Sequence, residues 1–243
     1  MSPRSALPHG YANRTGRPRG LLTRGLGLLL PGVRGVSAQA DPYADAWAAH
    51  NRAALDAPGR RWVVLGDSMS QGVGASAWDA GWVDQALVAL RADGHELSVV
   101  NLSATGARTR DVLDQQLPVL HALPPAASDA PDLVSVMVGS NDLFAGPAAR
   151  RALPTAMDEL VAALPRGAVV ATLPQPRSAA RRANTFIEKR SATGELVMLD
   201  MRTDGPRSWS GRLAPDFFHP NDAGYAEIAR AILPGLRAAL GSA

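Results

Sequence analysis

The stretch Val63-Val64-Leu65-Gly66-Asp67-Ser68-Met69-Ser70-Gln71-Gly72-Val73-Gly74 joins an apolar run to a loop with regularly spaced glycines. The first residues have the apolar, β-branched character of a buried strand, and the run stops at Gly66-Asp67-Ser68. A serine hydroxyl is therefore expected where a buried strand emerges, which is a good position for a nucleophile. A serine that merely caps a turn fits this stretch equally well, so the rest of the chain has to decide.

Apolar runs alternate with helical patterns after Arg61, which predicts an α/β fold: a parallel sheet with helices on both faces. The expected strands are residues 62–66, 97–102, 133–138, 168–173 and 196–200. The expected helices are about 80–92, 108–117, 148–163, 177–193 and 222–240. Pro118 is expected to end the second helix and Pro234 to kink or split the last one, which begins at Asn221 or Asp222 as its N-cap.

Length and charge favour one globular domain, residues 41–243, preceded by an arm, residues 1–40. The formal net charge is +3, but six arginines and no acidic residue precede Asp41, so residues 41–243 carry about −3. The folded part is not basic, and no nucleic-acid partner is expected. No apolar run approaches the roughly 18 residues of a membrane span, so no transmembrane segment is predicted.

The arm is rich in Arg, Pro and Gly, and we expect it to be disordered, a targeting segment, or the product of a start codon placed too far upstream. Arg24, Pro31 and Arg34 interrupt the apolar centre that a secretory signal needs, which favours the cytoplasm over secretion. The chain has no cysteine, so disulfides and a cysteine nucleophile are excluded. The sequence does not indicate an oligomeric state.

Polar residues and glycines follow three of the expected strands, at the edge of the sheet where ligands bind in open α/β folds. They are Gly66-Asp67-Ser68, the turn at Gly106, and Gly139-Ser140-Asn141-Asp142. The backbone N–H groups of Ser68 and Gly106 and the Asn141 carboxamide could all donate to a developing oxyanion. A tight turn at Gly106 and an Asx turn at Asn141 are the structural alternatives.

A serine nucleophile needs a base, usually an imidazole held by a carboxylate. His219 follows Asp216 by three residues, just before the last helix, so the two side chains can meet across one turn. The other histidines, His9, His50, His95 and His121, are expected to be solvated bystanders.

Gly66-Asp67-Ser68, Gly106, Gly139-Ser140-Asn141-Asp142 and Asp216-Phe217-Phe218-His219-Pro220 resemble, in the same order, the four sequence blocks of the SGNH hydrolases, also called GDSL esterases and lipases. The resemblance implies a flavodoxin-like three-layer α/β/α sandwich with a five-stranded parallel sheet. It implies that Ser68 is the nucleophile, His219 the base and Asp216 its orienting acid. The oxyanion hole would be Ser68 N–H, Gly106 N–H and the Asn141 side chain. Met69 replaces the leucine usual after Gly-Asp-Ser, with little change of volume.

The expected activity is hydrolysis of carboxylic esters of small to medium acyl groups through an acyl-enzyme. A carbohydrate O-deacetylase, a thioesterase and a non-catalytic α/β binding module are the alternatives. No cofactor or metal is expected, because Asp67 and Asp142 are interpreted as hydrogen-bonding struts of their loops. Trp209 and Phe217 are offered as walls of a substrate pocket, whereas Trp78, Trp82, Phe144 and Phe218 are expected to pack in the core or in loops.

Overall fold

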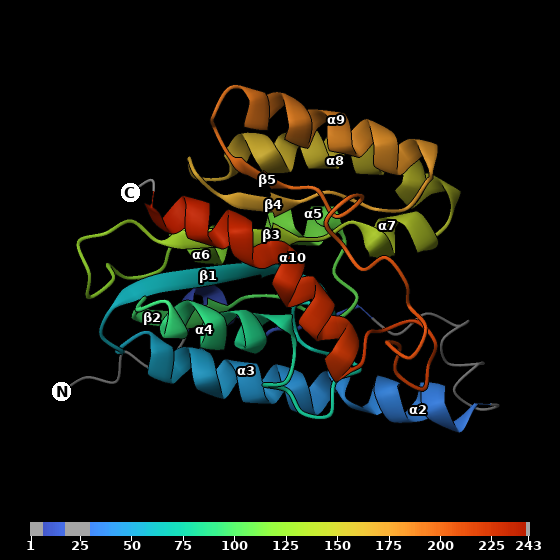
Figure 1. Ribbon diagram of the computed structural model, residues 1–243, viewed down its shortest axis with the longest axis horizontal. Helices are drawn as coiled ribbons and strands as arrows, with labels where there is room; N and C mark the ends of the chain where they lie inside the picture. Colours follow the sequence, from blue (N-terminus) through green and yellow to red (C-terminus); the bar gives the residue numbers. More distant parts are fainter. Residues whose placement is uncertain (1–6, 18–29, 242–243) are drawn as a thin grey trace.

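The computed structural model describes residues 7–17 and 30–241, and it contains one five-stranded sheet in the order β2-β1-β3-β4-β5 (Figure 1). All neighbouring strands are parallel. The strands are β1 (Arg60–Gly66), β2 (Leu97–Asn101), β3 (Leu133–Met137), β4 (Val169–Ala171) and β5 (Val197–Leu199). The predicted flavodoxin-like α/β fold is confirmed. The strand order reverses between β1 and β3, and the crevice above such a reversal is where these sheets bind ligands.

The strands are buried on both faces, which explains their nearly continuous apolar sequences. In β1, Val63 and Leu65 pack into the core on one side of the sheet. Trp62 and Val64 pack into the core on the other side. Side chains of a strand alternate between faces, so one apolar run contributes to two cores.

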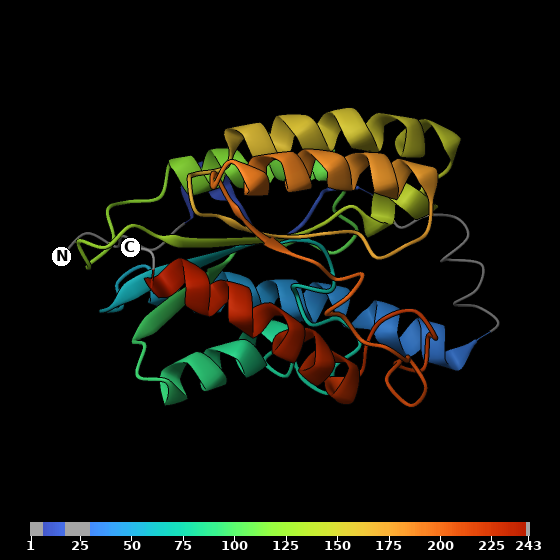
Figure 2. The ribbon, with the colours of Figure 1, turned by 45° about the horizontal axis from the view of Figure 1, so that its top comes forward.

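Helices cover both faces of the sheet and make a three-layer sandwich (Figure 2). One face carries α8 (Pro147–Ala163), α9 (Ser178–Ala192) and a continuous segment of α5 (Thr109–Asp111), η2 (Val112–Gln116) and α6 (Leu117–His121). The other carries α4 (Trp82–Ala92) and α10 (Asp222–Gly241), with α3 (Ala40–Ala54) beside β2. The short elements are η1 (Pro8–Gly10), α2 (Pro31–Ala38) and α7 (Ser140–Phe144). None of the helices within the described ranges is both long and apolar enough to span a bilayer.

One of the two predictions about prolines was wrong. The helix expected to stop at Pro118 continues to His121, because the π-helical turn η2 directly precedes it. A wider turn accommodates a residue that lacks an N–H and would clash with the carbonyl four residues back in a regular α-helix. Pro234 lies inside α10 without splitting it. Asn221 is the N-cap of α10, since its Oδ1 accepts from the Gly224 N–H at 3.0 Å.

The described parts of residues 1–40 pack on the domain, unlike the separate arm that was expected. Leu7 belongs to a hydrophobic core. At Gly32 of α2, an added Cβ would lie 2.2 Å from the Pro215 carbonyl oxygen, so this helix lies directly on the loop before Asp216. Residues 1–6 and 18–29 lie outside the described residues, and a targeting role for the segment stays a prediction.

The prediction for His50 was also wrong, because the helix α3 that carries it was not expected. The imidazole is half-buried, with ring centroids 5.3 Å from Trp47 and 5.6 Å from Trp78. Burial lowers the pKa of His50. Apolar residues at positions 43, 44, 47 and 54 have the helical spacing that could have revealed α3.

Candidate active site

Ser68, His219 and Asp216 form one hydrogen-bonded chain at the carboxyl edge of the sheet. Ser68 lies two residues beyond the end of β1, and His219 lies three residues before α10. The Ser68 Oγ is 2.9 Å from His219 Nε2, and His219 Nδ1 is 2.6 Å from Asp216 Oδ2. The structure thus brings together the three side chains that the sequence pointed to. Serine and histidine are separated by 151 positions, so only the tertiary fold makes this contact.

The loop after Ser68 packs closely against the turn that carries His219. At Gly74, whose φ is +99°, an added Cβ would lie 2.5 Å from the Pro220 carbonyl oxygen and 2.7 Å from His219 Cβ. Only glycine accommodates both this conformation and this approach. The same loop is held from α10 by Tyr225, whose hydroxyl donates to the Val73 carbonyl at 2.6 Å. The glycine spacing of this loop therefore sets how near the imidazole comes to Ser68.

Asp216 is held in its ionised form. Burial raises the pKa of this carboxyl, but hydrogen bonds and the charge of His219 outweigh it, and the pKa lies below its usual value. Oδ1 accepts from the backbone N–H groups of Phe218 at 3.1 Å and His219 at 3.0 Å, which leaves Oδ2 for Nδ1 of the imidazole. A carboxylate with these donors fixes the imidazole with Nε2 towards Ser68.

The three predicted oxyanion donors differ in their hydrogen bonding and surroundings. The Ser68 N–H makes no hydrogen bond to any residue within the described ranges. Gly106 has a φ of +78°, and a Cβ there would meet nothing within 4 Å, so its loop faces open space. Both hydrogens of the Asn141 carboxamide are engaged, since Nδ2 donates to the Ala107 carbonyl at 2.9 Å and to Asp67 Oδ2 at 3.2 Å. Asn141 can donate to a substrate oxygen only by giving up one of these bonds.

Asp67 and Asp142 make the loop hydrogen bonds that were predicted for them. Asp67 Oδ1 accepts from the Met69 N–H at 3.0 Å. Asp142 Oδ2 accepts from the Thr109 N–H at 3.0 Å. Burial raises the pKa of Asp67 to about 6 and also raises that of Asp142. The carboxylate beside Ser68 is thus costly to keep ionised in the folded protein.

Residues 11–17, which we call the N-terminal strap, support the loops around Ser68. Asn13 is 1% exposed, and its Nδ2 donates to the carbonyls of Asn101 at 2.7 Å and Ser103 at 2.9 Å. Its own carbonyl accepts from Gln71 Nε2 at 3.0 Å. Gln71 Oε1 in turn accepts from the Thr105 N–H at 2.7 Å. The strap therefore ties the loop that carries Ser68 to the loop that carries Gly106.

Aromatic residues near the site make ring contacts with one another and with the imidazole. The ring of Phe218 contacts His219, with centroids 5.0 Å apart, and Phe144 lies 5.6 Å beyond it. Phe217 is 80% exposed and has a φ of +57°, and within the described residues it makes no ring contact with the imidazole. We call these three phenylalanines the aromatic rim. Phe144 and Phe218, expected to be packing residues, belong to the site's border.

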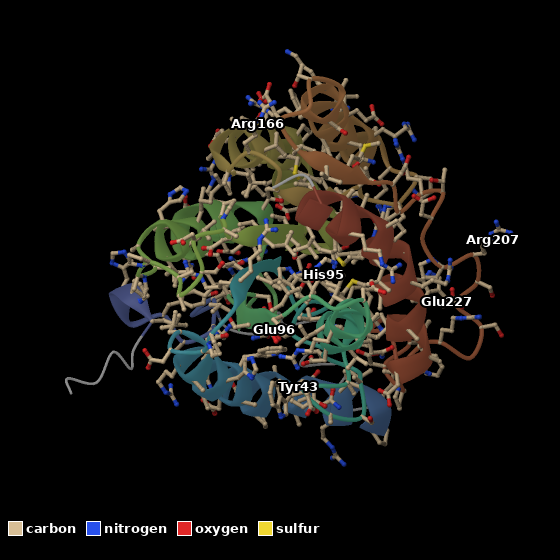
Figure 3. The ribbon with its side chains drawn as sticks, turned by 60° about the vertical axis from the view of Figure 1, so that its left-hand side comes forward. Tyr43, His95, Glu96, Arg166, Arg207 and Glu227 are labelled. Carbon is tan, nitrogen blue, oxygen red and sulfur yellow. The ribbon has the colours of Figure 1, made fainter. Side chains whose placement is uncertain are left out.

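Trp209 lies on the exposed loop between β5 and α10, where the Arg207 side chain also projects from the protein (Figure 3). Within the described residues, its indole makes no hydrogen bond or ring contact with Ser68, His219 or Asp216. Its role in substrate binding stays a prediction.

The comparisons with known proteins agree with this site. Residues 64–227 match the model of the GDSL-like lipase/acylhydrolase family, so the chain belongs to that family. The family makes it an ester-hydrolysing enzyme. A search of curated protein sequences gave no match.

Solved structures with the same fold include TesA, at 21% identity and a TM-score of 0.57 over 74% of this chain and 99% of TesA. Another is the psychrotrophic esterase EstA from Pseudoalteromonas sp., at 20% identity and a TM-score of 0.55 over 75% and 99% of the two chains. A third is the acetylxylan esterase Axe2 from Geobacillus stearothermophilus, at 20% identity and a TM-score of 0.55 over 73% and 94%. At these identities the likeness concerns the fold alone.

Proposed function

We propose that the protein hydrolyses carboxylic esters of small to medium acyl groups through an acyl-enzyme on Ser68. Ser68 Oγ attacks the ester carbonyl carbon while its proton passes to His219 Nε2. The tetrahedral intermediate then collapses, the bond to the alcohol oxygen breaks, and His219 returns the proton to the leaving alcohol. Water repeats the sequence on the acyl-enzyme and releases the acid.

The observation that carries this proposal is the continuous chain from Ser68 Oγ through both imidazole nitrogens to Asp216, with links of 2.9 and 2.6 Å. A serine hydroxyl is a weak nucleophile until a base at hydrogen-bond distance can accept its proton. The lowered pKa of Asp216 keeps a negative charge beside the imidazolium that forms during attack. A serine that only capped a turn would need neither partner.

The oxyanion would be held by the N–H groups of Ser68 and Gly106 and by Asn141. Of the hydrogen bonds that Asn141 Nδ2 makes, the one to Asp67 is the longer, at 3.2 Å against 2.9 Å to Ala107. We propose that this longer bond is exchanged for the substrate oxygen. Substituting Asn141 by Ala should lower kcat by roughly 10²–10³. An unchanged kcat on p-nitrophenyl butyrate would make Asn141 a structural residue.

The decisive experiment compares Ser68→Ala with Ser70→Ala. Both serines are buried in the same loop, but the Ser70 hydroxyl has no hydrogen-bond partner in the described structure. Ser68→Ala should abolish turnover of p-nitrophenyl acetate and butyrate and abolish labelling by a fluorophosphonate probe, whereas Ser70→Ala should keep both. Retained turnover in folded Ser68→Ala would refute the mechanism. Absence of labelling in the wild type would favour a non-catalytic binding module.

A further inference from the structure

A cavity lies between the N-terminal ends of α8 and α9. It has a volume of about 470 Å³. Four arginine side chains line it: Arg150 and Arg151 from α8, Arg177 at the N-cap of α9, and Arg182 from α9. Neither the hydrolytic reaction nor the packing of the core uses this concentration of positive charge.

The charge in this cavity is not neutralised from within the protein. Other arginines form ion pairs, such as Arg190 with Glu195 and Arg202 with Asp200. The four cavity arginines make no ion pair with any carboxylate in the described parts of the chain. Like charges held close together repel one another, so an arrangement of this kind gains stability when an anion enters.

The N-terminal ends of α8 and α9 add to the positive potential in this cavity. A helix N-terminus carries a partial positive charge, which Asp or Glu in the first turn commonly offsets. Neither α8 nor α9 has an acidic residue in its first turn. The first-turn residues Pro147, Ser178 and Ala179 line the cavity together with the guanidinium groups, so the partial charge of the helix ends adds to theirs, a combination that suits phosphate oxygens.

Ring contacts connect the cavity to the catalytic imidazole. The Arg177 guanidinium lies 5.4 Å from the ring centroid of Phe144. Phe144 contacts Phe218, and Phe218 contacts His219, with centroid distances of 5.6 and 5.0 Å. A substrate with its ester carbonyl at Ser68 could thus lie along the aromatic rim and reach the arginines with a distal group.

We propose that this cavity is an anion subsite that binds a phosphate group carried by the ester substrate, away from the ester bond. The proposal rests on the proposed function, since it names the class of ester that the same site would take. Guanidinium groups bind phosphate oxygens in pairs, which gives geometric selection in addition to charge. A neutral ester of the same acyl group is then the poorer substrate.

The first test measures binding without turnover. Inorganic pyrophosphate is titrated into the full chain by calorimetry at low salt, using the wild type and Arg151→Gln/Arg182→Gln. Both positions are exposed, so the variant should fold. The control is Arg52→Gln/Arg166→Gln, which removes the same charge at exposed positions on α3 and beyond the far end of α8 (Figure 3). We expect at least about tenfold weaker binding in the cavity variant only. Equal affinities in all three proteins would overturn the proposal.

The second test compares 10-butyryloxydecyl phosphate with 10-butyryloxydecan-1-ol, whose chain is long enough to run from Ser68 along the aromatic rim to the arginines. In the wild type the ratio of their kcat/KM values should exceed about ten, and it should fall towards one in the cavity variant but not in the control. Arginine-dependent pyrophosphate binding with no preference for the phosphorylated ester would mean that the cavity holds a free anion, and would overturn the substrate assignment. Arginine-dependent binding with no hydrolysis of either ester would refute the proposed function while the anion site remained.

Discussion

The two sides of the crevice around Ser68 differ in construction. On one side lie the buried polar residues Asn13, Gln71 and Asn101, each at most 1% exposed and each hydrogen-bonded to a neighbouring loop. We call this side the hydrogen-bonded wall. On the other side lies the aromatic rim, whose phenylalanines are between 48% and 80% exposed.

The hydrogen-bonded wall is suited to holding the loops around Ser68 in position, and the aromatic rim is suited to contacting a substrate. Leaving a buried polar group unpaired costs free energy, so a fully hydrogen-bonded network favours a single arrangement. It thereby fixes the loops of Ser68 and Gly106 relative to each other. Exposed rings gain their packing only when a ligand covers them. Substitutions in the wall should therefore change kcat and stability, and substitutions in the rim should change KM.

The largest effect is expected in the wall, from Gln71→Ala. Gln71 joins the Asn13 carbonyl to the Thr105 N–H, so its loss leaves buried groups unpaired on both loops. We expect a loss of about 2–4 kcal/mol in the free energy of unfolding and a fall in kcat of up to about 10²-fold, from displacement of the Gly106 loop. Urea unfolding and p-nitrophenyl butyrate kinetics measure both.

Gln71→Met is the matched variant, because it keeps most of the side-chain volume and removes the acceptor for the Thr105 N–H and the donor to Asn13 without adding a buried charge. It should lie between the wild type and Gln71→Ala. If Gln71→Ala raised KM and left kcat unchanged, the distinction between the two sides would fail.

A smaller effect concerns the pH dependence of stability and tests Asp67, next to Ser68. Its pKa rises from 3.8 to about 6 on folding, because burial disfavours the charged form. Between these pH values the folded state binds more protons than the unfolded state, so the contribution of Asp67 to stability falls as pH rises.

The matching variant is Asp67→Asn, which cannot titrate. From about pH 4 to about pH 7.5, the unfolding free energy of the wild type should fall by up to about 3 kcal/mol relative to that of the variant. Urea denaturation at several pH values gives this difference. A constant difference would mean that Asp67 keeps its usual pKa in the folded protein.

The smallest effect is expected in the rim, from Phe218→Ala. Phe218 is 48% exposed, so its loss should change the free energy of unfolding by less than about 1 kcal/mol. A substrate that covers the ring loses apolar contact, and KM for p-nitrophenyl butyrate should rise about three- to tenfold. Val88→Ala is the control, since this apolar side chain is 68% exposed on α4, away from the crevice. A rise in KM for Val88→Ala as well would remove the special role of the rim.

The sheet and the chemical residues were predictable because their signals are local. Each strand shows in its own apolar run, and the position of Ser68 follows from the end of β1. Asp216 and His219 are three residues apart, so one turn suffices to join them.

The wall was not predictable from local patterns, because its contacts join distant positions. Asn13 and Asn101 are 88 residues apart, and the segment of Asn13 resembles a free arm in composition. The ring contact between Phe218 and His219 was not predictable either, because it depends on the local backbone, in which Phe217 has a φ of +57°. Phe217 as a wall of a substrate pocket stays a prediction.

The N-terminal strap has a consequence for proteolytic maturation. A cut after Ala40 would remove Asn13, and the carbonyls of Asn101 and Ser103 would each lose a buried donor, as Gln71 would lose an acceptor. Water would have to enter beneath the nucleophile loop to replace them. A shortened protein would therefore keep Ser68, His219 and Asp216, but the loop that carries Ser68 would be held by fewer buried hydrogen bonds than in the full chain.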